Sequence, residues 1–252
     1  MKFNKIALFN VEVNASNPAQ ALSELEALLE RGQPAYVCFL EGNLLSRLSS
    51  DAALRKALND AALVYPDGIA VLKALRWKSG TSAERVSGPS LLLEACRFGL
   101  DKGWRHYFYG GAEGVAKQLA ERLSELYPGL QVAGTYSPPF RELSAIEEEE
   151  ITQRIEASKP TLLWVGLGGP KQEFWMARHL SKIEVPLMLG VGAAFDFHSG
   201  TRPWAPRWVR KLGLEWLFRM LSGGGRTFRR NLICVPKVAI MLARERIRCI
   251  GK

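Results

Sequence analysis

The chain has 252 residues, enough for one α/β domain with an appendage or for two small domains. Hydrophobic residues make up 47% of the chain and charged residues 23%, and these ordinary values exclude collagen-like, low-complexity and wholly disordered proteins. The longest apolar stretch, residues 232–243, is interrupted by Pro236 and Lys237. It is shorter than the roughly 20 apolar residues of a transmembrane helix, so a multi-span membrane protein is excluded as well.

The net charge of +9 is concentrated near the C-terminus. Residues 202–252 contain 13 Lys and Arg against only Glu215 and Glu245, whereas residues 1–201 contain 21 Lys and Arg against 23 Asp and Glu. The tail therefore carries +11 and the rest of the chain −2. This asymmetry indicates an anionic partner for the tail, such as lipid headgroups, a diphosphate or nucleic acid.

The cysteines and the N-terminal residues favour a cytoplasmic protein. Four cysteines are widely spaced and form no CxxC pair, which argues against a disulfide framework or a zinc knuckle. Residues 1–13 lack the apolar core of a secretory signal. We therefore expect a reducing compartment.

Short apolar runs alternate with amphipathic stretches, which predicts an α/β fold with a mostly parallel sheet and crossover helices. In chain order the expected elements are a helix at 18–31, a strand at 35–40, a helix at 90–102, a strand at 104–109, a helix at 112–127, a strand at 131–135, a helix at 144–158, a strand at 162–166, a helix at 172–179 and a strand at 186–190. The acidic run at 147–150 fits the first turn of its helix, where the dipole favours negative charge.

Two expected strands end in glycine-rich turns that precede helices, in the strings YFYGGAEG at 107–114 and WVGLGGPKQE at 164–173. Glycine lets the backbone approach a ligand, and a helix N-terminus presents free N–H groups, so Gly110, Gly111 and Gly168 could cradle phosphate. Neither string is a dinucleotide fingerprint. In the second string, Gly166-x-Gly168 is followed by Lys171 at the position where the fingerprint has its third glycine. An NAD-dependent enzyme is disfavoured, and tight turns without a ligand remain an alternative.

Two aspartates stand out as candidate acids or bases. Asp67 lies in a Pro-Asp-Gly turn, a string that is also a strong turn signal without any function, and Asp196 is flanked by phenylalanines. The histidines, His106, His179 and His198, are scattered and have no metal-ligand spacing, and no Asp-x-Asp pair is present. We therefore expect neither a metal site nor a cofactor.

Eight strings occur in one order along nearly the whole chain: EGN at 41–43, YPDGIAV at 65–71, ERVSGPSLL at 84–92, YGGAEGVA at 109–116, LYPGL at 126–130, WVGLGGPKQEFW at 164–175, GVGAAFDFHSGTRPWAPRW at 190–208 and GLEWLFRM at 213–220. Together they resemble the WecG/TagA/CpsF family of bacterial glycosyltransferases. The resemblance implies inverting, metal-independent transfer from a UDP-sugar of the N-acetylmannosamine, uronic acid or glucose type. The acceptor would be a polyprenyl-diphosphate-linked sugar, a precursor of cell-surface polysaccharide.

The resemblance also implies roles for individual residues. Asp67 matches the family's catalytic base, with Asp196 as the rival. Further positions match substrate-binding motifs: Glu41, Asn43, Arg85, Gly110, Gly111, Gly168, Lys171, Gln172 and Asp196. Tail arginines would bind the lipid diphosphate: Arg219, Arg226, Arg229 and Arg230. The chain departs from many relatives at Glu41, where they have Thr, and at Gly223-Gly224, where they have Glu-Pro.

These expectations divide the chain into a Rossmann-like α/β catalytic domain at 1–201 and a basic helical appendage at 202–252 that binds the membrane and the diphosphate. The expected partners are the UDP-sugar, the lipid-linked acceptor and the inner face of the cell membrane, without nucleic acid. Homo-oligomerisation stays open. Two alternatives also stay open, a basic nucleic-acid-binding protein and a non-catalytic, nucleotide-binding membrane adaptor.

Overall fold

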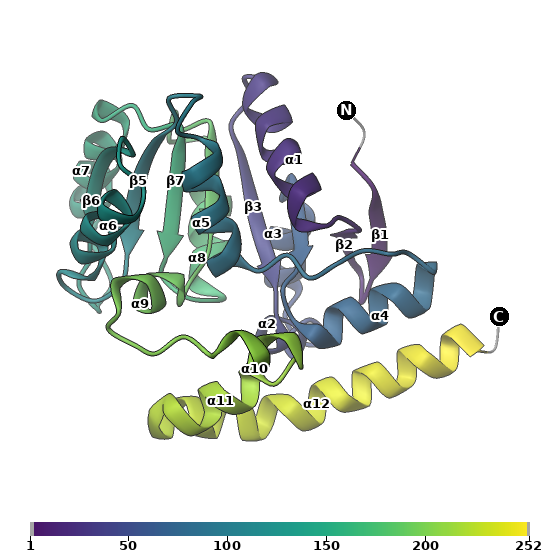
Figure 1. Ribbon diagram of the computed structural model, residues 1–252. Coiled ribbons are helices and arrows are strands. Elements are labelled where there is room, and N and C mark those ends of the chain that lie inside the picture. The colour runs from purple at the N-terminus through teal and green to yellow at the C-terminus, as the bar shows by residue number, and fades with distance from the viewer. Residues whose placement is uncertain (1–2, 251–252) are drawn as a thin grey trace.

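A computed structural model describes residues 3–250, except for the side chains of residues 226, 227, 230 and 250. Figure 1 shows a central sheet with helices on both faces, and a further group of helices across the edge toward which the strand arrows point. The strands are β1 (Lys5–Leu8), β2 (Val11–Asn14), β3 (Ala35–Leu40), β4 (Leu63–Pro66), β5 (Arg105–Gly110), β6 (Gln131–Tyr136), β7 (Leu162–Gly166) and β8 (Leu187–Gly190).

The helices are α1 (Pro18–Glu30), α2 (Gly42–Leu45), α3 (Ala52–Asn59), α4 (Ile69–Ser79), α5 (Gly88–Phe98), α6 (Val115–Leu126), α7 (Ala145–Ala157), α8 (Lys171–His179), α9 (Ala194–Ser199), α10 (Arg207–Lys211), α11 (Glu215–Ser222) and α12 (Gly224–Ile250). Six strands form one parallel sheet in the order β4-β3-β8-β7-β5-β6. This arrangement confirms the predicted α/β fold with a parallel sheet and flanking helices.

Both faces of the sheet are buried, as the continuous apolar runs predict. Along β3, Tyr36 and Cys38 belong to one hydrophobic cluster, and Val37 and Phe39 belong to the other. The first cluster is covered by α2, α3, α4, α7, α8 and α12, and the second by α1, α5, α6 and α9. This alternation follows from the two-residue period of a strand, and it fixes the register of the whole sheet.

β1 and β2 form a separate antiparallel hairpin whose turn residues, Phe9 and Asn10, have φ of 53° and 64°. The hairpin covers the outer edge of β4, because Asn14 Oδ1 accepts a hydrogen bond of 2.8 Å from the Val64 amide. An edge strand covered in this way cannot pair with another chain.

The basic tail folds into α10, α11 and α12, and α12 packs along α4 and α2. Cys234 and Val238 of α12 join the hydrophobic core, and the buried Glu245 lies 3.7 Å from the ammonium of Lys78 on α4. Pro236 lies inside this helix. Over the described residues, no helix combines the length and the apolar character needed to cross a membrane.

Candidate active site

The candidate residues gather at the carboxyl edge of the sheet. β3 ends at Leu40 and β4 at Pro66, and these two residues are partners in the parallel register. The backbone amides of Asp67 and Gly68 both donate to the Leu40 carbonyl oxygen, at 3.1 Å each. The loops that begin at Glu41 and Asp67 therefore leave the sheet side by side, at the edge where open α/β sheets bind ligands.

Gly68 allows these two loops to touch. A Cβ atom at this position would lie 3.2 Å from the Gly42 amide nitrogen and 3.3 Å from the Glu41 Cα atom. Any larger residue would push the loops apart. The close approach of the neighbouring loop therefore explains why the Pro-Asp-Gly turn has glycine at this position.

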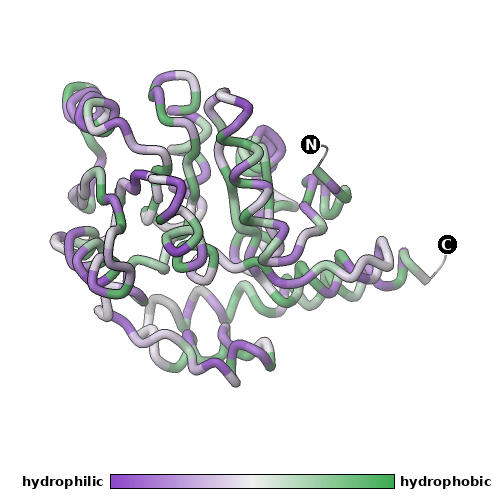
Figure 2. The backbone as a smooth tube through the Cα atoms, turned by 45° about the horizontal axis from the view of Figure 1, so that its top comes forward, coloured by the Kyte–Doolittle hydropathy of each residue, from purple (hydrophilic) through white to green (hydrophobic). Residues whose placement is uncertain are grey.

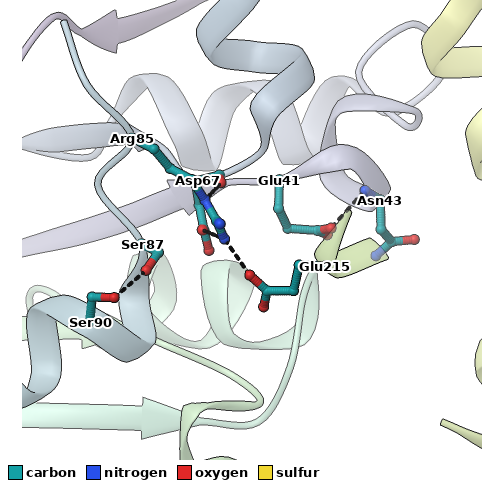
Figure 3. A network of polar contacts seen from close by, with 7 residues as sticks. All are labelled: Glu41, Asn43, Asp67, Arg85, Ser87, Ser90 and Glu215. Atoms are coloured by element: carbon teal, nitrogen blue, oxygen red, sulfur yellow. Dashed lines mark hydrogen bonds and ion pairs between the residues drawn. The ribbon is translucent and has the colours of Figure 1, made fainter. Parts of the chain in front are cut away.

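Asp67 and Glu215 both bind the same arginine, Arg85, and we call these three residues the acid–arginine cluster (Figure 3). Arg85 Nη2 donates to Asp67 Oδ1 at 2.9 Å and to Glu215 Oε2 at 2.7 Å, and Arg85 Nε donates to the Asp67 backbone carbonyl. The side chains of Asp67, Arg85 and Glu215 are 16%, 23% and 11% exposed. They are accessible to a substrate yet largely shielded from water, which strengthens their charge interactions.

The surroundings of Asp67 make it a stronger base than a free aspartate. Burial raises the pKa of the Asp67 carboxyl above its ordinary value, the Arg85 guanidinium acts against this rise, and the negative charges of Glu215 and Glu41 add to it. A raised pKa increases the affinity of the carboxylate for a proton, while the arginine favours the ionised form. Asp67 is therefore suited to accept a proton from a hydroxyl group.

Glu41 and Asn43 belong to the short helix α2. The Glu41 carboxylate caps this helix by accepting hydrogen bonds from the amides of Asn43 and Leu44, at 2.9 and 3.1 Å. This capping holds Glu41 beside the Asp67 loop. The Asn43 residue is 6% exposed, and its side chain makes no hydrogen bond within the part of the chain that the structure describes. That amide group is therefore available to a ligand.

The two glycine-rich turns contact each other at the ends of β5 and β7. Gly110 has φ of 134°, and a Cβ atom there would lie 2.5 Å from the Gly166 carbonyl carbon. The Gly111 amide donates to the Gly166 carbonyl oxygen at 3.0 Å. These contacts give the glycines a packing role that does not require a ligand.

Gln172 ties the second turn to the neighbouring strand end. The Gly168 amide donates to Gln172 Oε1 at 3.1 Å, and Gln172 Nε2 donates to the Gly190 carbonyl at 2.7 Å and to Glu173 Oε1 at 3.0 Å. Lys171, in contrast, is exposed and forms no ion pair with any described residue. Gln172 is thus fixed within the turn, and the Lys171 ammonium is left to solvent or a ligand.

Asp196 lies on α9 and has a different partner. Its Oδ2 is 3.3 Å from Arg202 Nε, and its side chain is 25% exposed. No hydrogen bond or ion pair between described residues links Asp196 to the acid–arginine cluster. Among the described side chains, no three His, Cys, Asp or Glu residues lie close enough together to hold a metal ion.

The structure describes the side chains of two of the four tail arginines. The Arg219 guanidinium lies 5.6 Å from the centre of the Phe197 ring, and Arg229 is exposed on α12. Arg226 and Arg230 lie outside the described side chains. Neither described arginine belongs to the acid–arginine cluster, so their contact with a lipid diphosphate stays a prediction.

Two acidic residues at this edge do not follow from the sequence analysis. Glu215 is one of only two acids in the basic tail, and this isolation within the GLEW string is the signal that could have found it. Glu173 is fully buried, burial raises its pKa to about 7, and its Oε2 has no hydrogen-bond partner among the described residues. Its only sequence signal is its place in the GGPKQE string.

Comparison with known proteins assigns the chain to a family, since the profile of the "Glycosyl transferase WecG/TagA/CpsF family" matches residues 6–250. The chain belongs to the WecG/TagA/CpsF family. The N-acetylglucosaminyldiphosphoundecaprenol N-acetyl-beta-D-mannosaminyltransferase of Bacillus spizizenii strain W23 is 28% identical over 227 residues, which are 89% of this chain and 86% of the relative. Enzymes of the same name from Staphylococcus aureus strains MRSA252 and MW2 are 24% identical over 246 residues, 97% of this chain and 95% of each relative.

This match confirms the resemblance based on the eight sequence strings. It also identifies the chain as a glycosyltransferase. In this WecG/TagA/CpsF glycosyltransferase, the acid–arginine cluster lies at the carboxyl edge of the sheet, where Arg85 joins Glu215 of α11 to the loop that follows β4.

Proposed function

We propose that this protein transfers a sugar of the N-acetylmannosamine type from a UDP-sugar to a polyprenyl-diphosphate-linked sugar, with inversion of the anomeric carbon. The relatives are named for transfer of an N-acetylmannosaminyl group to N-acetylglucosaminyldiphosphoundecaprenol, which supports this choice of substrates. A β linkage also appears in that name. An α-linked nucleotide sugar gives a β-linked product when a single displacement inverts the anomeric carbon.

The acid–arginine cluster is the observation that carries the proposal. A hydroxyl oxygen of the acceptor attacks the anomeric carbon, and the bond from that carbon to the diphosphate oxygen breaks. The electron pair of that bond leaves with UDP, and Asp67 takes the hydroxyl proton. The raised pKa of Asp67 favours this proton transfer, and Arg85 holds the carboxylate in position through its bonds to Oδ1 and the backbone.

The leaving diphosphate gains negative charge during the reaction, and positively charged groups of the protein can stabilise it. Arg85 lies next to Asp67, and the exposed Lys171 begins α8 at the same edge of the sheet. Such groups act like an oxyanion site, because they stabilise charge that develops only in the transition state. We therefore propose that transfer does not require a divalent cation.

Residues 202–252 form a membrane-binding appendage in this proposal. The outer face of α12 carries exposed apolar and cationic residues at helical spacing, namely Ile233, Lys237, Ile240, Arg244 and Ile247. Figure 2 shows hydrophilic and hydrophobic residues alternating along this helix. Such a helix suits the interface of an anionic membrane, where each Lys or Arg contributes about 1 kcal/mol to binding. This location would bring the site to a lipid-linked acceptor.

A screen of UDP-sugars against a short-chain lipid-diphosphate sugar tests the proposed function. We expect release of UDP and a product whose mass has grown by one sugar residue, with UDP-N-acetylmannosamine as the preferred donor. Tight binding of UDP without release of UDP or growth of the acceptor would contradict the proposal. That result would favour a nucleotide-binding membrane adaptor.

A further inference from the structure

A small basic pocket lies beside the acid–arginine cluster, between the start of α5 and α10. Its volume is about 210 Å³, below the roughly 300–1,000 Å³ typical of pockets that hold whole small ligands. The pocket therefore suits one group of a larger substrate. Its lining residues are Arg85, Ser87, Ser90, Arg207, Arg210 and Lys211.

Four of these six residues are cationic and none is acidic. Burial lowers the pKa of Arg210, and the positive charges of Arg85 and Arg207 lower it further, against the opposite effect of Glu215. Arg85, Arg207 and Arg210 line the same pocket, so these cations are close enough to repel one another. An anion in the pocket would relieve this repulsion, as in other sites that gather arginines around phosphate.

Arg210 is held in place, yet part of its hydrogen-bonding capacity is unused. Its guanidinium carbon lies 3.6 Å from the centre of the Trp204 ring, which fixes the plane of the group. Its Nε atom is buried and has no hydrogen-bond partner among the described residues. A ligand in the pocket would therefore be held by the parts of the Arg210 guanidinium that line the pocket, and not by this buried nitrogen.

The start of α5 adds neutral donors on the opposite wall. Ser87 is the N-cap residue, but its side chain does not cap the helix, because Ser87 Oγ donates to Ser90 Oγ at 2.9 Å. The first-turn amides therefore have no side-chain cap, and the helix dipole places partial positive charge there. Figure 3 shows the two serines beside Asp67 and Arg85, so an anion held here would lie near the reacting atoms.

We propose that this pocket is a subsite for the diphosphate group of a sugar-diphosphate ester. The inference rests on the proposed function and adds α10 to the substrate-binding surface. Two substrates of the reaction carry such a group, the UDP-sugar donor and the lipid-linked acceptor. Both would present the same chemistry to the pocket, two adjacent phosphates bearing negative oxygens.

The test measures ligand binding, not turnover. Arg210→Gln removes the half-buried cation, and the double variant Arg207→Gln/Lys211→Gln changes only exposed α10 side chains, so it spares the fold. Arg97→Gln is the matched control, because Arg97 is exposed near the other end of α5 and, among the described residues, forms an ion pair only with Glu94. Binding of UDP and of a short-chain prenyl-diphosphate sugar would be measured by calorimetry, with binding to anionic vesicles as a third arm.

We expect both pocket variants to weaken binding of one diphosphate ligand by about 10- to 100-fold, as loss of a charge-assisted hydrogen bond would. A loss confined to UDP assigns the pocket to the donor, and a loss confined to the prenyl ligand assigns it to the acceptor. Equal affinities of the wild type and both pocket variants for both ligands would overturn the proposal, and so would a loss confined to vesicles. If diphosphate binding is lost in these variants while the wild type transfers no sugar, the subsite stands and the proposed function fails.

Discussion

Glu215 Oε2 lies 2.7 Å from Arg85 Nη2, although 130 residues separate the two along the chain. The same Arg85 nitrogen contacts Asp67, so α11 is connected to the proposed base through one guanidinium. The negative charge of Glu215 also contributes to the raised pKa of Asp67. The C-terminal helices thus help to set the electrostatics of the site.

Replacing Glu215 by Gln should shift the pH dependence of transfer. The substitution keeps an oxygen that can accept from Arg85 but removes a charge that raises the pKa of Asp67. The pKa should fall, and because a base works only when deprotonated, the acidic limb of the kcat/KM profile should move to lower pH. Glu245→Gln, on α12 and away from the cluster, is the control and should leave this limb in place. An unmoved limb in Glu215→Gln would show that Glu215 does not act on the base.

Replacing Asp67 by Asn should abolish most of the turnover. Asn keeps the size of the side chain but cannot accept the proton, so kcat should fall by roughly 10²- to 10⁴-fold while UDP-sugar binding changes little. The thermal midpoint should stay near that of the wild type, which separates lost chemistry from a damaged turn. Asp196→Asn is the comparison. If Asp67→Asn keeps more than about a tenth of the wild-type turnover, the loss is too small for a general base. The role would then pass to Asp196.

Replacing Glu173 by Gln should change how stability depends on pH. The folded-state pKa of Glu173 is about 7, whereas an unfolded glutamate has a pKa of about 4.3. The folded state therefore binds more protons between these values, and this group makes the free energy of unfolding fall as pH rises through that window. Gln resembles the neutral acid, so the variant should gain about 1–3 kcal/mol relative to wild type on going from pH 4 to pH 8.

Urea unfolding across this pH range measures the difference. Glu150→Gln is the control, because Glu150 is exposed on α7. Parallel stability profiles for wild type and Glu173→Gln would mean that Glu173 ionises as an ordinary glutamate.

Transfer should continue in excess EDTA. Arg85 and the other cations of the pocket beside it can neutralise the leaving diphosphate, and the sequence has no Asp-x-Asp pair for a metal-bound nucleotide. The measurement is UDP release with and without the chelator. Loss of turnover that added magnesium or manganese restores would refute a metal-independent reaction.

The exposed isoleucines of α12 should control membrane binding. The triple variant Ile233→Ser/Ile240→Ser/Ile247→Ser removes apolar side chains that are 54–69% exposed, so it should release the protein from anionic vesicles without disturbing the core. Ile146→Ser removes an isoleucine of α7 that is 73% exposed, and this control should sediment with vesicles like the wild type. Equal sedimentation of all three proteins would mean that this face of α12 does not contact lipid. Substitution is a cleaner test than deletion of the tail, because α12 also supplies core residues.

The strongest sequence patterns predicted the sheet well. Both β3 and β7 have their predicted bounds, because a short uninterrupted apolar run is typical of a strand that is buried on both faces of a parallel sheet. The prediction missed β4, whose four residues end in proline, and the hairpin of β1 and β2, whose residues are mixed in polarity. It also missed α2, a four-residue helix whose start depends on the Glu41 cap.

The site could be predicted only in part. The family resemblance named Glu41 and Asp67 as site residues, but because β4 was not predicted, their proximity at one edge follows only from the parallel pairing of β3 with β4 in the structure. The hydrogen bond between Arg85 and Glu215 joins two segments that are 130 residues apart in the chain, so no local sequence pattern predicts it. The burial of Glu173 depends in the same way on packing that a single sequence does not contain.

The position of β8 has a consequence for how the enzyme is made. Among the described residues β8 is the last strand, yet it lies between β3 and β7 in the sheet. While the ribosome makes the protein, the pair β3-β4 and the group β7-β5-β6 cannot be joined before β8 emerges. At about 5–20 residues per second, the chain then needs a further second or more to reach α11. Asp67 and Arg85 are therefore joined by Glu215 only late in translation. Until then, a nascent chain lacks the complete acid–arginine cluster.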